Sequence, residues 1–132
     1  MPRSESDHPT ELELEILKVL WQESPLLVRQ IRARLGEEAG RILAHSTVVT
    51  MLNIMHRKGF VRRKKDGKSF LFSPKDEREN VVGKMMGDLV SKAFDGSASA
   101  MMLNLLETND LDVEELDELR KLIARKSKEL KE

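Results

Sequence analysis

The apolar residues of the first 58 positions recur at helical spacing in three successive segments, and this pattern constrains the fold more than any other feature of the sequence. Before the first segment, Thr10 and Glu13 have the spacing of a capping box, which predicts a helix start. Ser24-Pro25 interrupts this helix, and a second, shorter helix is expected to end near Gly36. Two amphipathic helices are therefore expected before the first loop.

The third helical segment leads into a hairpin. Ser46 can cap this helix, and Gly59 is expected to end it. Asp66-Gly67 is a strong two-residue turn, because it tolerates the positive φ that tight hairpins require. The segments beside the turn are rich in Phe, Val and Leu, and Ser73-Pro74 closes the second strand. Three helices followed by a basic hairpin is the order of a winged helix-turn-helix.

Three further helices with wide apolar stripes are expected after this hairpin, over residues 76–94, over 97–106, and from Asp112 onward. So few helices cannot shield such stripes from water among themselves, so a second copy of the chain is expected to cover them. The residues expected at this dimerisation surface are Met85, Met86, Leu89, Met101, Met102, Leu105, Leu116, Leu119 and Ile123. The predicted fold class is mainly α, with a disordered N-terminus (1–8), a winged helix-turn-helix of three helices plus a β-hairpin wing (9–75) and an α-helical dimerisation domain (76–132).

Positive charge is concentrated in one part of a chain whose net charge is zero. Residues 41–75 carry nine Lys or Arg against Asp66 alone, whereas residues 1–40 have a net charge of −3 and residues 76–132 have −5. Such a stretch suggests a polyanion-binding surface, with a solvated basic loop as the alternative that composition leaves open. Because predicted helices precede this basic stretch, a nucleic-acid-binding surface is favoured over a solvated loop.

Composition excludes several other classes of protein. Hydrophobic residues make up 39% and charged residues 35%, and no apolar run approaches the ~20 residues that span a bilayer. The absence of cysteine excludes disulfides, thiol catalysis and thiolate metal sites. The first residues lack the apolar core of a secretory signal, so a cytoplasmic protein is expected.

The third helix is the element expected to enter the major groove of DNA. When its apolar stripe faces inward, three hydroxyls and one amide lie on its outer side, and these groups can hydrogen-bond to base edges. The expected base contacts are Ser46, Thr47, Thr50 and Asn53. The alternative is that Ser46 and Thr47 only cap the helix.

The cations around this helix are expected to contact phosphates, which position a protein on DNA without reading its sequence. These residues are Arg41, Arg57, Lys58, Arg62, Arg63, Lys64, Lys65 and Lys68. His45 has two equal interpretations, a phosphate contact or a residue that fills the turn.

Catalytic motifs find little support. The sequence has no HExxH, no G-x-S-x-G and no phosphate-binding glycine loop. His8, His45 and His56 lack metal-ligand spacing, and the methionines fit a core or an interface better than a metal site. We therefore expect a protein that is not an enzyme and that has no cofactor and no metal.

Four segments together resemble the penicillinase repressor family, typified by BlaI and MecI. They are TELELEILKVLW, STVVTMLNIMHRKGFV, KDGKSFLFSP and AFDGSASAMMLNLLE, within about residues 9–126. Each segment alone is a weak signal, whereas the ordered set is specific.

The resemblance implies a homodimer whose winged domains bind a two-fold symmetric operator and whose C-terminal helices form the dimer. In that family, repression ends when a transmembrane sensor metalloprotease responds to a β-lactam and the repressor is cut within its dimerisation domain. The family's cut falls at an Asn-Phe bond, and the matching bond here is Asn104-Leu105, where leucine replaces phenylalanine. An interface or capping role is the alternative for Asn104.

The function predicted from the sequence is a sequence-specific DNA-binding transcriptional repressor that acts as a homodimer on a palindromic operator. Dimerisation is expected to place two recognition helices roughly one DNA turn apart. One alternative is a winged-helix regulator that senses a small molecule in a pocket between its two parts. Another is a winged helix that is used only for protein contact.

Overall fold

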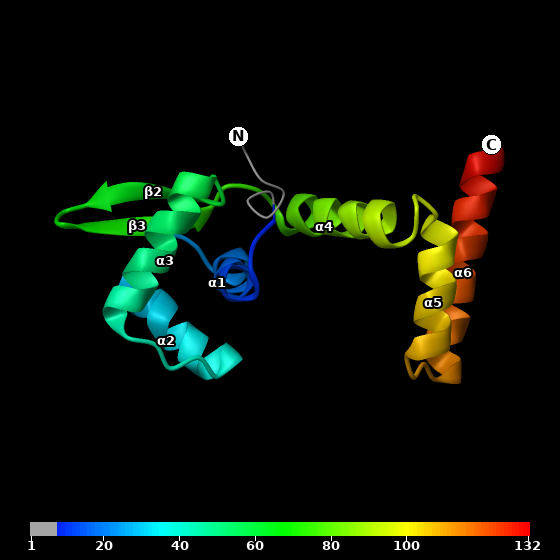
Figure 1. The fold of residues 1–132 in the computed structure, drawn as a ribbon, viewed down its shortest axis with the longest axis horizontal. Coiled ribbons are helices and arrows are strands. Elements are labelled where there is room, and N and C mark those ends of the chain that lie inside the picture. The colour runs from blue at the N-terminus through cyan, green and yellow to red at the C-terminus, as the bar shows by residue number, and fades with distance from the viewer. Residues whose placement is uncertain (1–7) are drawn as a thin grey trace. The chain divides into compact units, whose positions relative to one another are not determined.

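The computed structural model describes residues 8–132, and the chain divides into two compact units, residues 1–87 and 88–132. Of the segment that was predicted to be disordered, residues 1–7 lie outside the described residues. Figure 1 shows the elements α1 (Glu11–Gln22), β1 (Leu26–Leu27), α2 (Val28–Ala39), α3 (His45–Lys58), β2 (Val61–Asp66), β3 (Ser69–Pro74), α4 (Arg78–Ala93), α5 (Ala98–Thr108) and α6 (Val113–Lys131). This order confirms the predicted fold class, a mainly helical chain with a winged helix-turn-helix.

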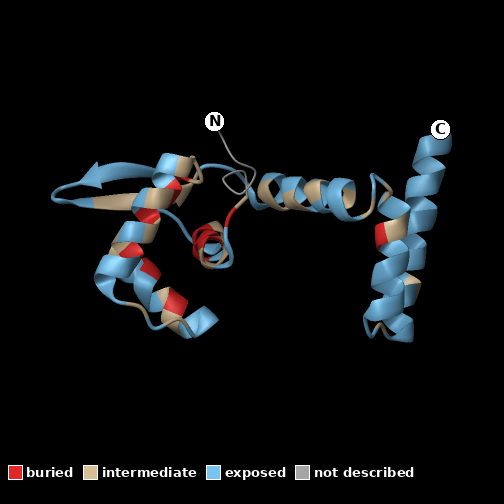
Figure 2. Cartoon of the chain, in the orientation of Figure 1, coloured by how far each residue is buried: buried red, intermediate tan, exposed pale blue. Residues whose placement is uncertain are grey.

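The first unit has a closed hydrophobic core to which α1, α2, α3 and the sheet each contribute (Figure 2). Its buried apolar residues are at most 4% exposed, and they are Ile16, Leu17, Val19, Leu20, Leu26, Ile31, Leu35, Val48, Leu52, Met55, Val61 and Phe72. Complete burial of one such side chain stabilises a fold by roughly 1.5–3 kcal/mol. The helical spacing seen in the sequence therefore corresponds to the face that each helix buries.

Helix ends agree with the sequence at some positions and differ at others. The capping box at the start of α1 is confirmed, with the Glu13 N–H donating to Thr10 Oγ1 at 3.3 Å and the Thr10 N–H donating to Glu13 Oε1 at 2.9 Å. The predicted end of the second helix at Gly36 was wrong, because α2 continues to Ala39 and ends at Gly40, whose φ is +66°. A left-handed residue ends a helix at low cost only where glycine occupies the position.

The predicted cap at the start of α3 was also wrong. Ala44 occupies the N-cap position without a side-chain hydrogen bond, and the helix begins at His45. Ser46 therefore lies inside the first turn, where its hydroxyl is exposed rather than used as the N-cap. The predicted end of this helix at Gly59 is confirmed, with a φ of +86°.

The hairpin has the predicted strands, but its turn is shifted by one residue. Asp66 pairs with Ser69, so the two loop residues are Gly67 and Lys68. Gly67 has a φ of +64° and Lys68 does not have a positive φ, and positive φ at the first loop position alone is the pattern of a type II′ turn. The strand order is β1-β3-β2, in which the two-residue strand β1 is too short to leave an alternating pattern in the sequence.

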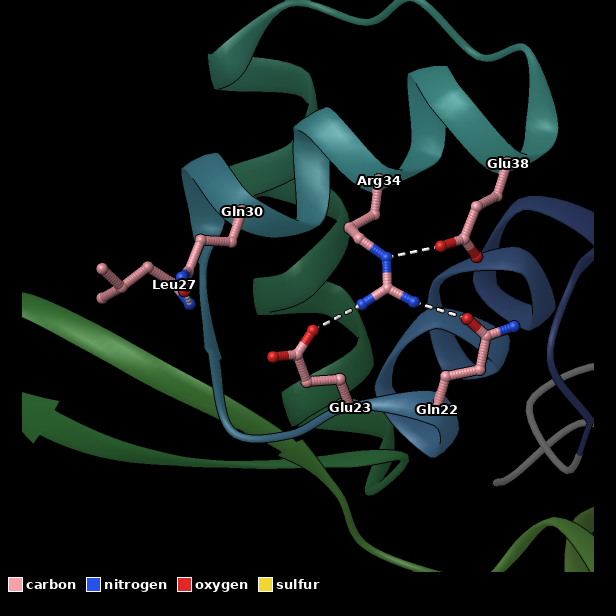
Figure 3. Close-up of polar contacts among 6 residues, drawn as sticks. All are labelled: Gln22, Glu23, Leu27, Gln30, Arg34 and Glu38. Atoms are coloured by element: carbon pink, nitrogen blue, oxygen red, sulfur yellow. Dashed lines mark hydrogen bonds and ion pairs between the residues drawn. The ribbon is translucent and has the colours of Figure 1, made fainter.

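A polar network holds α2 against the end of α1 (Figure 3). The Arg34 guanidinium donates to Glu23 Oε1 at 2.9 Å and also donates to Gln22 and Glu38. The hydrogen bond to Glu38 and the nearby carboxylate charges raise the pKa of Arg34. This network fixes the first helix of the helix-turn-helix relative to its support.

The second unit is built from the last turns of α4 and from α5 and α6. Asp95 and Gly96, with φ values of +51° and +85°, follow α4 at the predicted break. Asp112 caps α6 as predicted, with the Glu115 N–H donating to Asp112 Oδ1 at 2.8 Å. Among the described residues of this unit, Met101 alone is buried, at 9% exposure. None of the described helices is both long enough and apolar enough to span a bilayer.

Candidate nucleic-acid interface

The outer face of α3 is polar and open to solvent. Val48, Leu52 and Met55 are completely buried, so the opposite side of the helix faces outward. All four predicted base-contacting residues are exposed on α3, and they are Ser46, Thr47, Thr50 and Asn53. Arg57, a predicted phosphate contact, is exposed one turn after Asn53 on the same helix.

A groove of about 400 Å³ lies between α3 and the hairpin. Its walls come from α3, from β3 with the adjoining Arg63 of β2, and from the start of α2. The lining residues are Leu27, Val28, Arg29, His45, Val49, Asn53, Arg63, Lys68, Ser69, Phe70 and Phe72. Four predicted site residues, His45, Asn53, Arg63 and Lys68, therefore line one groove, whereas Ser46, Thr47 and Thr50 are exposed on α3 outside its lining.

Arg63 joins the hairpin directly to α3. Its Nη1 donates to Asn53 Oδ1 at 3.1 Å. The same guanidinium lies over the Phe70 ring, with its central carbon 4.6 Å from the ring centroid. Helix α3 and the hairpin thus meet through two side chains for which the sequence analysis expected separate roles.

The cations of the wing divide between the two faces of the hairpin, because successive side chains of a strand point to opposite faces. Arg63 contacts Phe70 and α3, so Arg63 and Lys65 share the face toward the helices. Arg62 and Lys64 lie on the other face, and neither lines the groove.

Lys58 is held inside the first unit. Its Nζ lies 3.0 Å and 3.2 Å from the two carboxylate oxygens of Glu13, a residue that is only 1% exposed. A buried carboxylate without its cation is costly, so the Lys58 ammonium group serves as the cation partner of Glu13 in this structure. The sequence showed Lys58 only as one member of a basic stretch.

Arg41 also has acidic partners from α1. Its Nε donates to Glu15 Oε1 at 2.8 Å, and its Nη2 lies 3.8 Å from Glu11 Oε2. The hydrogen bond and charge of Glu15 raise the pKa of Arg41. Arg41 and Glu15 are both partly exposed, and ion pairs that water can reach contribute little to stability, so they do not prevent Arg41 from changing partner.

Arg29 is a groove residue that the sequence analysis did not select. It lies in the first turn of α2, is exposed, and lines the groove with His45 and Lys68. A helix N-terminus favours anions, so an arginine there adds charge to a position already suited to phosphate. Charge counting missed it because residues 1–40 are acidic as a whole.

The sequence profile of the penicillinase repressor family matches residues 9–125 of the chain. The chain belongs to this family. The transcriptional regulator BlaI of Mycobacterium tuberculosis is 32% identical over 116 residues, which cover 86% of this chain and 81% of the relative. The penicillinase repressor of Bacillus licheniformis is 25% identical over 123 residues, which cover 93% of this chain and 94% of the relative.

Among solved structures, the complex structure of hsRosR-SG, a form of RosR from H. salinarum, has a TM-score of 0.56 at 17% identity. The match covers 96% of this chain and 99% of that chain, and it is a likeness of fold. The curated relatives are named as a penicillinase repressor, a transcriptional regulator and a methicillin resistance regulatory protein, and none of these names is that of an enzyme. The resemblance noted in the sequence is confirmed, and the chain is a DNA-binding transcriptional repressor of this family.

Proposed function

We propose that this repressor binds a specific operator with the outer face of α3 and uses the groove beside α3 to grip the DNA backbone. The observation that carries the proposal is the contact between Arg63 and Asn53, which joins the polar face of α3 to the cationic wing in one surface. The groups offered to base edges are three hydroxyls and one amide on the exposed face of α3, from Ser46, Thr47, Thr50 and Asn53. Arg29, Lys65 and Lys68 supply positive charge for the phosphates on the groove side.

The repressor acts as a homodimer through its second unit. Large apolar side chains of this unit stay open to solvent in a single chain, for example Met102 at 55% and Ile123 at 63% exposure. An apolar groove of about 500 Å³ runs along α5 and α6 and is lined by Leu105, Leu119 and other apolar residues. A second copy presents the same surface, and two such faces cover each other around a two-fold axis.

A symmetric dimer accounts for operator binding without any further part. Two recognition helices about one DNA turn apart match two half-sites of a palindrome. Once the first half-site is bound, the second binds as an intramolecular event, which raises affinity by roughly 10²–10⁴. Separation of the second units therefore releases the DNA.

Cleavage of the Asn104-Leu105 bond by a sensor protease is the release step that the family resemblance suggests. Both residues are exposed and lie inside α5, where Thr108 Oγ1 donates to the Asn104 carbonyl at 2.7 Å. A protease acts on such a bond when the helix opens locally. The cut separates Leu105 and all of α6 from the N-terminal part of the chain, which weakens the dimer and lowers the affinity for the operator.

Binding of the full chain to DNA fragments of its own genome tests the proposal. We expect the selected fragments to share a palindrome and nuclease footprints to span two half-sites. A protein that makes about 6–10 phosphate contacts loses roughly 10³–10⁵ in affinity between 50 and 200 mM salt, and a comparable loss is expected here. Binding without any sequence preference would contradict the proposal.

A further inference from the structure

Arg63 is held by two elements at once. Besides its hydrogen bond to Asn53, it lies over Phe70, whose ring centroid is 6.4 Å from that of Phe72. Phe72 is 3% exposed and belongs to the hydrophobic core. The guanidinium is therefore positioned by the fold, unlike a long cationic side chain that is free to find a phosphate.

The contact with Arg63 fixes the orientation of the Asn53 side chain. An asparagine amide carries one acceptor oxygen and two N–H donors, whereas a guanidinium carries donors only. Arg63 can therefore bond only to Asn53 Oδ1, and the Nδ2 donors of Asn53 must point elsewhere. Since Asn53 is exposed on α3, those donors are available to a base.

The pair of side chains then offers several donors and one acceptor oxygen that already bonds to a cation. Asparagine reads adenine by using both of its groups, since the oxygen accepts from N6 and the nitrogen donates to N7. Here Arg63 already donates to one of the two lone pairs of that oxygen, and its remaining N–H groups disfavour an exocyclic amine at the same place. Guanine presents two acceptors, N7 and O6, side by side in the major groove, and this edge matches a donor pair.

We propose that Arg63 is a positioning residue for Asn53, and that the Asn53–Arg63 pair selects guanine over adenine at the base facing it in each half-site. This inference rests on the proposed function, in which the outer face of α3 reads base edges. It differs from the role expected from the sequence, where Arg63 was one of several phosphate contacts.

The test uses the full chain and a library in which every base of the selected half-site is varied singly. We expect the wild type to prefer guanine at one position by about tenfold, the discrimination typical of a paired donor contact. Arg63→Gln and Asn53→Ala each abolish that preference, and they do so at the same position. Asn53→Asp, which offers acceptors only, shifts the preference there toward cytosine, whose N4 is a donor.

Arg62→Gln is the matched control, because it removes the same charge from the adjacent residue on the other face of the hairpin. This variant should weaken binding to every library member in equal proportion and keep the guanine preference. Thermal unfolding of each variant confirms that it is folded.

Two results overturn the inference and leave the proposed function intact. In one, Arg63→Gln lowers affinity for all library members equally, as Arg62→Gln does. In the other, the wild type prefers adenine, not guanine, at the base position where Asn53→Ala loses its preference. A wild type without any base preference would overturn the proposed function itself and this inference with it.

Discussion

The two units of the chain bury their apolar residues to very different extents. In the first unit, twelve apolar side chains from helices and sheet are at most 4% exposed. In the second unit, Met101 is 9% exposed, and leucines such as Leu105 and Leu119 remain 40–45% exposed. Both units have helices with well-formed caps and comparable apolar stripes, so local structure does not explain the contrast. The first unit buries its apolar side chains within a single chain, whereas the second leaves many of its large apolar side chains exposed to solvent.

The largest effect is expected from a charge placed on the open apolar face of the second unit. Leu119→Glu should convert the dimer to a monomer, because a carboxylate cannot be buried against the partner's apolar side chains. Affinity for the full operator should fall by about 10²–10⁴, while affinity for a single half-site stays unchanged. Sedimentation and fluorescence anisotropy measure the two quantities.

Lys128→Glu is the control for this variant, since it adds a carboxylate to an exposed position nine residues after Leu119, on the opposite side of α6. It should leave the dimer and operator binding intact. A monomeric Leu119→Glu chain that binds the full operator like the wild type would contradict the coupling between the two units.

The next largest effect is expected on stability, when a leucine is replaced by alanine in each of the two units. Leu52→Ala removes a side chain with no solvent exposure and should lower the free energy of unfolding by about 4 kcal/mol. Leu130→Ala removes one that is 76% exposed and should change it by less than about 0.5 kcal/mol. Denaturant unfolding of the full chain measures both variants. If both variants lost the same free energy of unfolding, Leu130 would have to be buried by contacts that the single chain does not show.

A smaller loss of stability is expected when the buried carboxylate of the first unit loses its cation. Lys58→Met should lower the free energy of unfolding by about 2 kcal/mol, since Glu13 is left without its charged partner. Lys65→Met, which removes a cation from the exposed wing, serves as the control and should cost far less. If instead Lys58→Met unfolds like the wild type and loses DNA affinity, Lys58 is a phosphate contact after all.

The smallest effect is expected on DNA affinity when Arg29 is replaced, the groove residue that charge counting did not select. Arg29→Gln should weaken binding to all DNA sequences by a few-fold and reduce the salt slope by about one contact per half-site. Lys18→Gln removes a cation from an exposed position on α1 that does not line the groove, and it should leave both quantities unchanged. If the salt dependence of DNA affinity were identical in the two variants, Arg29 would not be a phosphate contact.

Much of the fold could be predicted from the sequence because the relevant signals are local. The capping residues Thr10 and Asp112 and the terminator Gly59 act within one helical turn, and each lies where it was expected. The errors also have local causes. Gly36 and Gly40 are both plausible terminators, and only the backbone conformation of Gly40 decides between them. The turn of the hairpin moved by one residue because the register with β3 places Asp66 opposite Ser69.

The sequence by itself determined the family of the chain, its helix order and the surplus of apolar residues after the wing, because these depend on residue identity and periodicity. Only the tertiary structure decided what each cation does. Arg63 stands over Phe70 and reaches Asn53, Lys58 neutralises Glu13, and Arg29 joins the groove from a region of opposite net charge. A side chain's partner depends on which elements the fold brings within a few ångströms. The residues of these pairs are 10 positions apart for Asn53 and Arg63 and 45 positions apart for Glu13 and Lys58. No local pattern in the sequence predicts contacts between residues so far apart along the chain.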